Sequence, residues 1–147
     1  MDIVPPKTRS RMMSGIKSIN TQPELLVRSL LHRMGFRFRL HRRDLQGRPD
    51  IVMPKYRVAI FIHGCFWHQH QGCKYVKMPA SNVQFWAEKL NGNRKRDQQN
   101  IDHLLCSGWR VLVVWECAIR SRSGSDLSEK IVSWILGSER FRELPGN

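Results

Sequence analysis

Apolar and polar residues alternate along the chain in patterns that predict helices and strands. Residues 22–34 carry apolar side chains at helical spacing, and the segment opens with Thr21 as N-cap, Pro23 as an early helical residue and Glu24 as the third-position carboxylate of a capping box. Gly35 ends it. We therefore predict a helix that carries on one face Leu25, Leu26, Leu30, Leu31 and Met34.

Four strands are expected along the chain. Residues 36–41 alternate with period two, which is typical of a half-buried strand. A second strand is expected at 50–53, and the continuous apolar runs 57–62 and 109–115 indicate buried strands. In the alternating segment, the residues expected to face a core are Phe36, Phe38 and Leu40. Those expected to face outward are Arg37, Arg39 and His41.

Two further helices complete the pattern. The charged segment 82–106 is helical in pattern, with Gly92 as a break between two parts. Residues 126–136 form a last helix that is capped by Ser125 and ended by Gly137.

The order of these elements, α-β-β-β-α-β-α, predicts an α/β fold with a mixed central sheet flanked by helices. With 147 residues, no internal repeat and no linker, we expect one domain over 1–147. Residues 1–20 would form a basic N-terminal arm and 138–147 a C-terminal tail.

Charge points to the partner. The chain has 25 Lys and Arg against 12 Asp and Glu, a net charge of +13, which indicates a polyanion such as nucleic acid. The stretch before Pro49 holds eleven basic and only three acidic residues. We expect the N-terminal third to supply much of the phosphate contact.

The sequence argues against a membrane or secreted protein and against disulfide bonds. No run approaches the ~18 apolar residues of a spanning helix, and the N-terminus has no signal-peptide core. We expect a soluble cytoplasmic protein that binds no membrane. Its four cysteines should then be thiols or metal ligands. Cys106, which follows Leu104 and Leu105 at a helix end, should simply be packed.

Three soft ligands lie close together after the third strand. Cys65, His70 and Cys73 form a C-x4-H-x2-C cluster, and Cys117, after the strand 109–115, is the candidate fourth ligand. Three thiolates and one imidazole would close a tetrahedral site, so the zinc would be structural. The alternative is a set of unrelated thiols, because this spacing is less diagnostic than paired C-x2-C motifs.

A carboxylate stands at the start of the second strand. Asp50 follows a Gly-Arg-Pro turn, and the next strand ends at His63, so the two side chains should lie near each other at one sheet edge. Mg²⁺ commonly uses one or two carboxylates and completes its shell with water and phosphate oxygens. Asp50 is thus a candidate magnesium ligand, although an Asp that closes a turn is an equal alternative.

Two histidines remain once His70 is assigned to zinc. His63 and His68, beside a metal carboxylate, are candidates for proton transfer or phosphate contact. Asp97 would orient one of them if its helix packs over this loop, but ion pairing within 93–97 is the reading that the sequence favours. Capping alone accounts for Glu24.

Paired aromatic residues stand in basic surroundings. Phe66-Trp67 and Phe85-Trp86 have Lys74, Lys77 and Lys89 nearby. We expect one member of each pair in the core, and the other to stack on an exposed base or to wedge between base steps.

The chain resembles the very short patch repair (Vsr) endonucleases, which nick one DNA strand at T:G mismatches left by deamination of 5-methylcytosine. The resemblance runs from about Thr8 to Arg120. It departs at Gln69, Gln71 and Gly72, where related sequences have a longer histidine run, and at Ile62, where they have Thr. The motifs that carry it are Thr8-Arg-Ser10 with Met13 and Ile16, GRPD (47–50), HGCFWH (63–68), Phe85-Trp86 and WRVLVVWEC (109–117).

The resemblance implies a restriction-endonuclease-like core that acts as a monomer on double-stranded DNA. It also implies a bacterial, nucleoid-associated protein that contacts other DNA repair proteins. It implies Asp50 as the Mg²⁺ ligand, and hydrolysis on the 5′ side of the mismatched thymidine. His63 and His68 would act at the scissile phosphate, with Asp97 paired to His68 and Glu24 acting through water. Zinc would be bound by Cys65, His70, Cys73 and Cys117, and DNA by Met13, Ile16, Phe66, Trp67, Trp86 and Lys89.

Three hypotheses follow. The first is a Mg²⁺-dependent mismatch nickase, which uses Asp50, His63, His68 and the aromatic pairs together. The second is a zinc-stabilised DNA-binding module without hydrolysis, which leaves Asp50 and the spare histidines without a role. The third is a general nuclease of the same fold, which only substrate selectivity would separate from the first.

Overall fold

One five-stranded sheet forms the centre of the computed structural model, which describes residues 21–73, 76–120 and 124–145. The strand order is β1-β2-β3-β4-β5. The pairs β1–β2 and β2–β3 are antiparallel, and β3–β4 and β4–β5 are parallel, so the sheet is mixed as predicted. The strands are β1 (Arg39–Leu40), β2 (Ile51–Met53), β3 (Val58–His63), β4 (Arg110–Trp115) and β5 (Phe141–Leu144).

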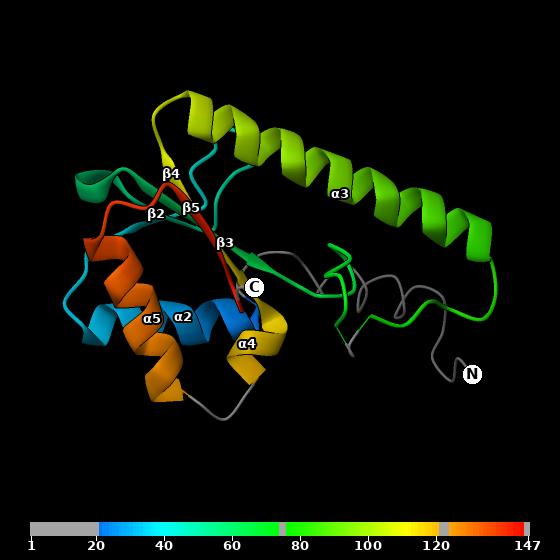
Figure 1. The fold of residues 1–147 in the computed structure, drawn as a ribbon, viewed down its shortest axis with the longest axis horizontal. Coiled ribbons are helices and arrows are strands. Elements are labelled where there is room, and N and C mark those ends of the chain that lie inside the picture. The colour runs from blue at the N-terminus through cyan, green and yellow to red at the C-terminus, as the bar shows by residue number, and fades with distance from the viewer. Residues whose placement is uncertain (1–20, 74–75, 121–123, 146–147) are drawn as a thin grey trace, which may run out of the picture.

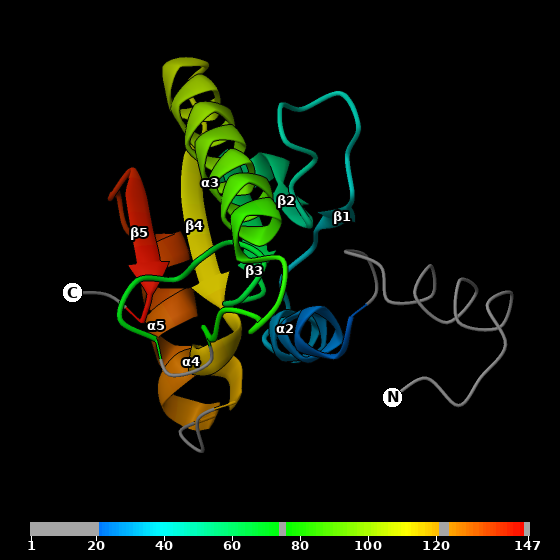
Figure 2. The ribbon, with the colours of Figure 1, turned by 90° about the vertical axis from the view of Figure 1, so that its right-hand side faces the viewer.

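Helices cover both faces of the sheet. The long α3 lies on one side, and α2, α4 and α5 lie on the other (Figures 1 and 2). Alternate residues of the buried strands β2, β3 and β4 therefore pack into two cores, one on each face. The helices are α2 (Gln22–Arg33), α3 (Val83–Cys106), α4 (Glu116–Arg120) and α5 (Gly124–Leu136), with a 3-10 turn η1 (Pro54–Tyr56).

The first helix begins as predicted but buries a different stripe. Oγ1 of Thr21 accepts a hydrogen bond from the backbone N–H of Glu24 (3.4 Å). Val27, Leu30 and Leu31 face the core, and Glu24, one turn earlier on the same stripe, is only 1% exposed. The remaining apolar residues of the predicted face, Leu25, Leu26 and Met34, are exposed.

The first strand is shorter than the alternation predicts. Only Arg39 and Leu40 pair with β2, at the edge of the sheet. Phe36 and Phe38 are half-buried against the core, as expected, but Leu40 is 41% exposed. An edge strand has a partner on one side only, so little burial rewards a longer pairing.

The second half of the chain holds five differences from the sequence prediction. Helix α3 runs unbroken through Gly92, because one interior glycine costs only about 1 kcal/mol while Leu90, Ile101 and Leu104 anchor the helix in the core. Cys106 is exposed, not packed. Helix α5 begins at Gly124, so the predicted cap, Ser125, lies inside it.

The two remaining differences are extra elements. The predicted tail 138–147 contains strand β5, which joins the free edge of β4. Helix α4 follows β4 directly and has no counterpart in the prediction. Within the described ranges 21–73, 76–120 and 124–145, none of the helices has the length and apolar character needed to cross a membrane.

Candidate active site and metal-ligand clusters

Parallel pairing brings the candidate residues to one end of the sheet. In the register of β3 and β4, His63 lies opposite Trp115. The loop after β3 and helix α4 after β4 therefore begin side by side. Asp50 enters from β2 next door, because Ile51 pairs with Ile60.

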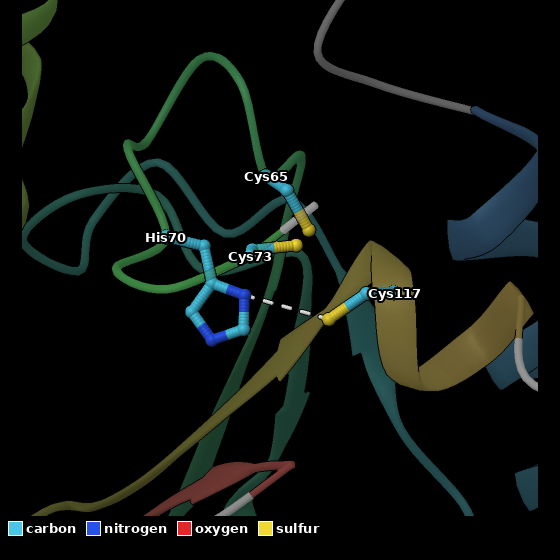
Figure 3. Close-up of side chains that lie close together, drawn as sticks. All are labelled: Cys65, His70, Cys73 and Cys117. Carbon is cyan, nitrogen blue, oxygen red and sulfur yellow. Dashed lines mark hydrogen bonds between the residues drawn. The ribbon is translucent and has the colours of Figure 1, made fainter. Parts of the chain in front are cut away.

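The four predicted zinc ligands lie together. Cys65, His70 and Cys73 come from the loop after β3, Cys117 comes from the start of α4, and their ligand atoms all lie within 4.8 Å of one another (Figure 3). The loop closes on itself, since the backbone N–H of His70 donates to the carbonyl of Cys65 (3.0 Å). Gly72, at φ 71°, occupies the left-handed region just before Cys73.

The donor set fits zinc. Bonds of about 2.1 Å to nitrogen and 2.3 Å to sulfur place tetrahedral neighbours roughly 3.6 Å apart. Nδ1 of His70 lies 3.4 Å from Sγ of Cys117. Burial raises the pKa of Cys65 to about 12 and also raises the pKa of Cys117, so only a cation at this place would favour the thiolate forms.

Trp115 joins this cluster to the neighbouring histidines. Its ring stacks on His70 (centroids 4.3 Å apart) and meets His63 edge to face at 5.1 Å. Nε1 of Trp115 donates to Oε1 of Glu143 (3.1 Å), on β5. Burial lowers the pKa of His70, and the negative charge of Glu143 acts against that shift. The last strand thus places a carboxylate beside a candidate zinc ligand.

The second cluster consists of His63, His68 and Asp97. The two imidazoles stack at 3.9 Å with an interplanar angle of 5°, and Nδ1 of His68 lies 2.5 Å from Oδ2 of Asp97. The unbroken helix α3 carries Asp97 over the loop, and Nδ2 of Asn93 donates to the carbonyl of Trp67 (3.1 Å). Asp97 therefore pairs with a histidine and not, as the sequence favoured, with neighbouring cations.

His63 is held neutral. It is 5% exposed, and burial together with the charge of His68 lowers its pKa well below the usual value. Among the described residues, no group accepts from or donates to its Nδ1. Both histidines and Asp97 line a cavity of about 760 Å³, to which Arg94 and Gln98 of α3 also contribute.

The third cluster surrounds Asp50. The backbone N–H of Ile62 donates to Oδ2 of Asp50 (2.7 Å). Burial and a hydrogen bond with Glu24 raise the pKa of Asp50 to about 8, against smaller opposing effects that include the charge of Arg28. Two buried carboxyl groups in contact share a proton until a cation replaces it.

Arg28 and His41 engage the two oxygens of Glu24. Nη2 of Arg28 donates to Oε2, and Nε2 of His41 lies 2.8 Å from Oε1. Ligand atoms of Glu24, His41 and Asp50 all lie within 4.8 Å of one another. The backbone N–H of Glu24 thus bonds to the predicted N-cap Thr21, while its carboxylate, predicted to complete the capping box, lies in this cluster.

Comparison with known proteins identifies the family. The family model of the DNA mismatch endonuclease Vsr matches residues 1–74. The chain is 44% identical over 139 residues to the DNA mismatch endonuclease Vsr of Escherichia coli strain K12, which covers 92% of this chain and 88% of that protein. The chain belongs to the Vsr family of DNA mismatch endonucleases. It is also 50% identical over 118 residues to the type II nicking enzyme V.XorIIP of Xanthomonas oryzae pv. oryzae (80% of this chain, 86% of that one).

Membership of the Vsr family confirms the predicted class, a DNA endonuclease of mismatch repair. The observed sheet and helices agree with the α/β part of the prediction. Family membership therefore favours an endonuclease over the DNA-binding module without hydrolysis.

The predicted DNA-binding aromatics form one exposed cluster. Phe66 packs edge to face on Trp67 (5.1 Å) and on Trp86 (5.9 Å), and Phe85 meets Trp86 at 5.5 Å. The expected core member of each pair is absent: Phe66 and Trp86 are half-buried, and Trp67 and Phe85 are 41% and 58% exposed. They shield one another because the start of α3 extends beyond the sheet (Figure 1).

The remaining predicted DNA contacts differ in what the structure says of them. Lys89 is exposed, one turn along α3 from Trp86. Met13 and Ile16 lie outside the described residues.

Sequence reasoning missed three residues of these sites. The alternation predicts an outward face for His41, whereas its side chain reaches Glu24. Arg28 lies one turn after Glu24 on α2, a spacing that could have suggested their ion pair. Glu143 lies in the segment taken as a tail, and nothing in the sequence pointed to it.

Proposed function

We propose that the chain cuts one strand of double-stranded DNA on the 5′ side of the thymidine in a T:G mismatch, with Mg²⁺ held at Asp50. The observation that carries this proposal is the meeting of two clusters at one end of the sheet. Glu24 and Asp50 offer buried carboxylates, and the stacked His63 and His68 offer proton-transfer groups. Deamination of 5-methylcytosine would supply such mismatches.

The carboxylates fit a divalent ion. Asp50 and Glu24 contribute two acidic groups, of which the charge of Arg28 compensates one. Mg²⁺ accepts one or two carboxylates and keeps its other positions for water and phosphate oxygens. When bound, the ion would polarise the scissile phosphate and stabilise the charge that develops on it.

The two histidines would have different roles in proton transfer. Burial keeps His63 in its neutral form, in which one ring nitrogen is an acceptor. His68 is oriented through Nδ1 by Asp97, which stabilises a positive charge on that ring and leaves Nε2 for the phosphate or the leaving group. Asp97 is thus a positioning residue for His68.

Zinc would have a structural role. Cys65, His70, Cys73 and Cys117 supply four donors, which leaves no coordination position open. They would tie the loop after β3 to helix α4 and so hold His68 and the aromatic cluster in place. The cluster, defined as Phe66, Trp67, Phe85 and Trp86, would wedge beside the mismatch, with Lys89 on a phosphate and Met13 and Ile16 entering from the other groove.

The proposal takes the chain as a monomeric, restriction-endonuclease-like domain over 1–147, with 1–20 as its basic arm. It would work at the bacterial nucleoid, with other DNA repair proteins as further partners. A general nuclease of the same fold is the alternative that the experiment must separate.

The test compares end-labelled T:G and T:A duplexes with and without Mg²⁺. We expect a single nick, 5′ to the mismatched thymidine, only with T:G and Mg²⁺. Equal cutting of both duplexes would indicate the general nuclease, and intact strands would refute hydrolysis. Asp50→Ala should lose nicking but keep binding of the T:G duplex. Asp44→Ala, an exposed Asp on the same loop, is the matched control.

A further inference from the structure

A histidine stands at the carboxylate site, although no motif of the sequence pointed to it. Nε2 of His41 lies 2.8 Å from Oε1 of Glu24, and the two share a neighbour in Asp50. We propose that His41 is a third protein ligand of the catalytic metal, and that its nitrogen makes this chain bind Mn²⁺ in strong preference to Mg²⁺. The inference rests on the proposed metal role of Asp50.

The distances fit a coordination shell. Adjacent donors of a six-coordinate ion with bonds of about 2.1 Å lie roughly 3 Å apart. The separation of 2.8 Å between Nε2 of His41 and Oε1 of Glu24 corresponds to such an edge. Asp50, whose ligand oxygen lies within 4.8 Å of both atoms, would be the remaining protein ligand, and water and phosphate oxygens would complete the shell.

The backbone is shaped for this placement. His41 has φ 47°, in the left-handed region that residues other than Gly, Asn and Asp seldom adopt. Its backbone N–H donates to the carbonyl of Asp50 (3.2 Å), directly after β1 ends. The chain therefore turns the imidazole back toward Glu24, where continued strand geometry would have turned it outward.

The local charge also favours a divalent cation. Glu24 and Asp50 can carry two negative charges, and Arg28, which donates to Oε2 of Glu24, supplies one positive charge. Nη2 of Arg28 is 3.3 Å from Nε2 of His41, so the guanidinium and the imidazole already flank one carboxylate. An ion between His41 and Asp50 would leave Arg28 on the far oxygen and would give a net positive site for the scissile phosphate.

The nitrogen donor decides the metal preference. Carboxylates serve Mg²⁺ and Mn²⁺ alike, whereas imidazole favours transition metals and contributes little to Mg²⁺. A site of two carboxylates and one imidazole should therefore bind Mn²⁺ more tightly, while Mg²⁺, the more abundant ion, still supports the reaction through the carboxylates.

The experiment uses the full zinc-loaded chain and the variant His41→Asn. Asparagine tolerates positive φ, so the turn is kept while the imidazole is lost. Binding of Mn²⁺ and Mg²⁺ is measured by titration, and pulsed EPR of bound Mn²⁺ records ¹⁴N coupling from directly bound imidazole. His103→Asn, an exposed histidine on α3, is the control.

We expect wild type and His103→Asn to show ¹⁴N coupling that His41→Asn lacks. In His41→Asn, Mn²⁺ affinity should fall about 10- to 100-fold and Mg²⁺ affinity less than about threefold. Persistent coupling, or an equal loss of both affinities, would overturn the inference and leave His41 as an orienting partner of Glu24. Nicking of the T:G duplex by wild type, measured in parallel, separates this failure from failure of the proposed function, which would abolish nicking with both ions.

Discussion

The thiol cluster and the carboxylate site lie at the same end of the sheet but offer different donor atoms. Cys65, His70, Cys73 and Cys117 bring four soft donors together, and burial raises the pKa of Cys65 to about 12. At the other site Glu24 is buried with Arg28 already on one oxygen. A closed soft site suits permanent zinc, whereas a compensated oxygen site suits an ion that exchanges with phosphate. Under the proposed function, the ion at the thiol cluster would maintain the fold and the ion at the carboxylate site would act on the phosphate.

The largest expected effect removes the structural side of this comparison. Cys117→Ala takes away the only proposed zinc ligand outside the loop after β3, so the loop and α4 lose their tie. We expect zinc loss and destabilisation by several kcal/mol, a fall in Tm of about 10 °C or more. Thermal unfolding and zinc content check it. Cys106→Ala, at an exposed cysteine outside the cluster, should change neither quantity.

The converse experiment impairs chemistry and spares the zinc. Asp97→Asn keeps the size of the side chain but removes the charge that orients His68. Nicking should slow by about 10²- to 10⁴-fold, with unchanged zinc content and mismatch binding. Asp102→Asn lies on the same helix and pairs only with Gln98 among the described side chains, so it serves as the control. Equal losses in both variants would mean that α3, not the His68 pair, was disturbed.

How much of each site the sequence could predict follows the same division. The thiol cluster was predictable because its ligands follow β3 and β4, two apolar strands that the pattern identifies and that pair in parallel. His41 was not, because its contact with Glu24 spans 17 residues and depends on one left-handed residue after a two-residue strand. Local alternation, which placed that side chain outward, carries no information on such a turn.

The fold shows the same limit. Strands β2, β3 and β4 are apolar and buried, and the pattern predicts all three. Strand β5 has a single buried residue, Leu144, among three exposed ones, so no periodicity marks it. It forms because β4 offers a free edge, which is a property of the assembled sheet.

A pH series tests the carboxylate site, where a metal ion must displace a proton before it can bind. In the folded protein the pKa of Asp50 is raised to about 8, so below that pH a metal must displace a proton from the carboxyl pair. Apparent affinity for Mg²⁺ should therefore rise about tenfold per pH unit up to about pH 8 and then level off. Without metal, the same shift means that the contribution of this carboxyl group to stability is full below its ordinary pKa of 3.8 and is lost as the pH rises through about 8. Unfolding at several pH values, with and without Mg²⁺, measures both; an affinity independent of pH between 6 and 8 would contradict the assignment.

The smallest effect tests whether β5 supports both the thiol cluster and the neighbouring histidine pair. Glu143 accepts a hydrogen bond from Trp115, whose ring stacks on His70. The negative charge of Glu143 raises the pKa of His70, against the effect of burial, and so favours positive charge at that imidazole. Partners behind a ligating histidine typically change metal affinity by about 10- to 100-fold. Because Glu143 is exposed to solvent, we expect Glu143→Gln, which keeps an acceptor for Trp115, to lower zinc affinity only about tenfold, measured by competition with a chelator. Glu139→Gln, an exposed neighbour paired with Arg142, is the control. Since Trp115 also contacts His63, a slower nick by fully zinc-loaded Glu143→Gln would show that β5 supports the chemistry as well as the zinc.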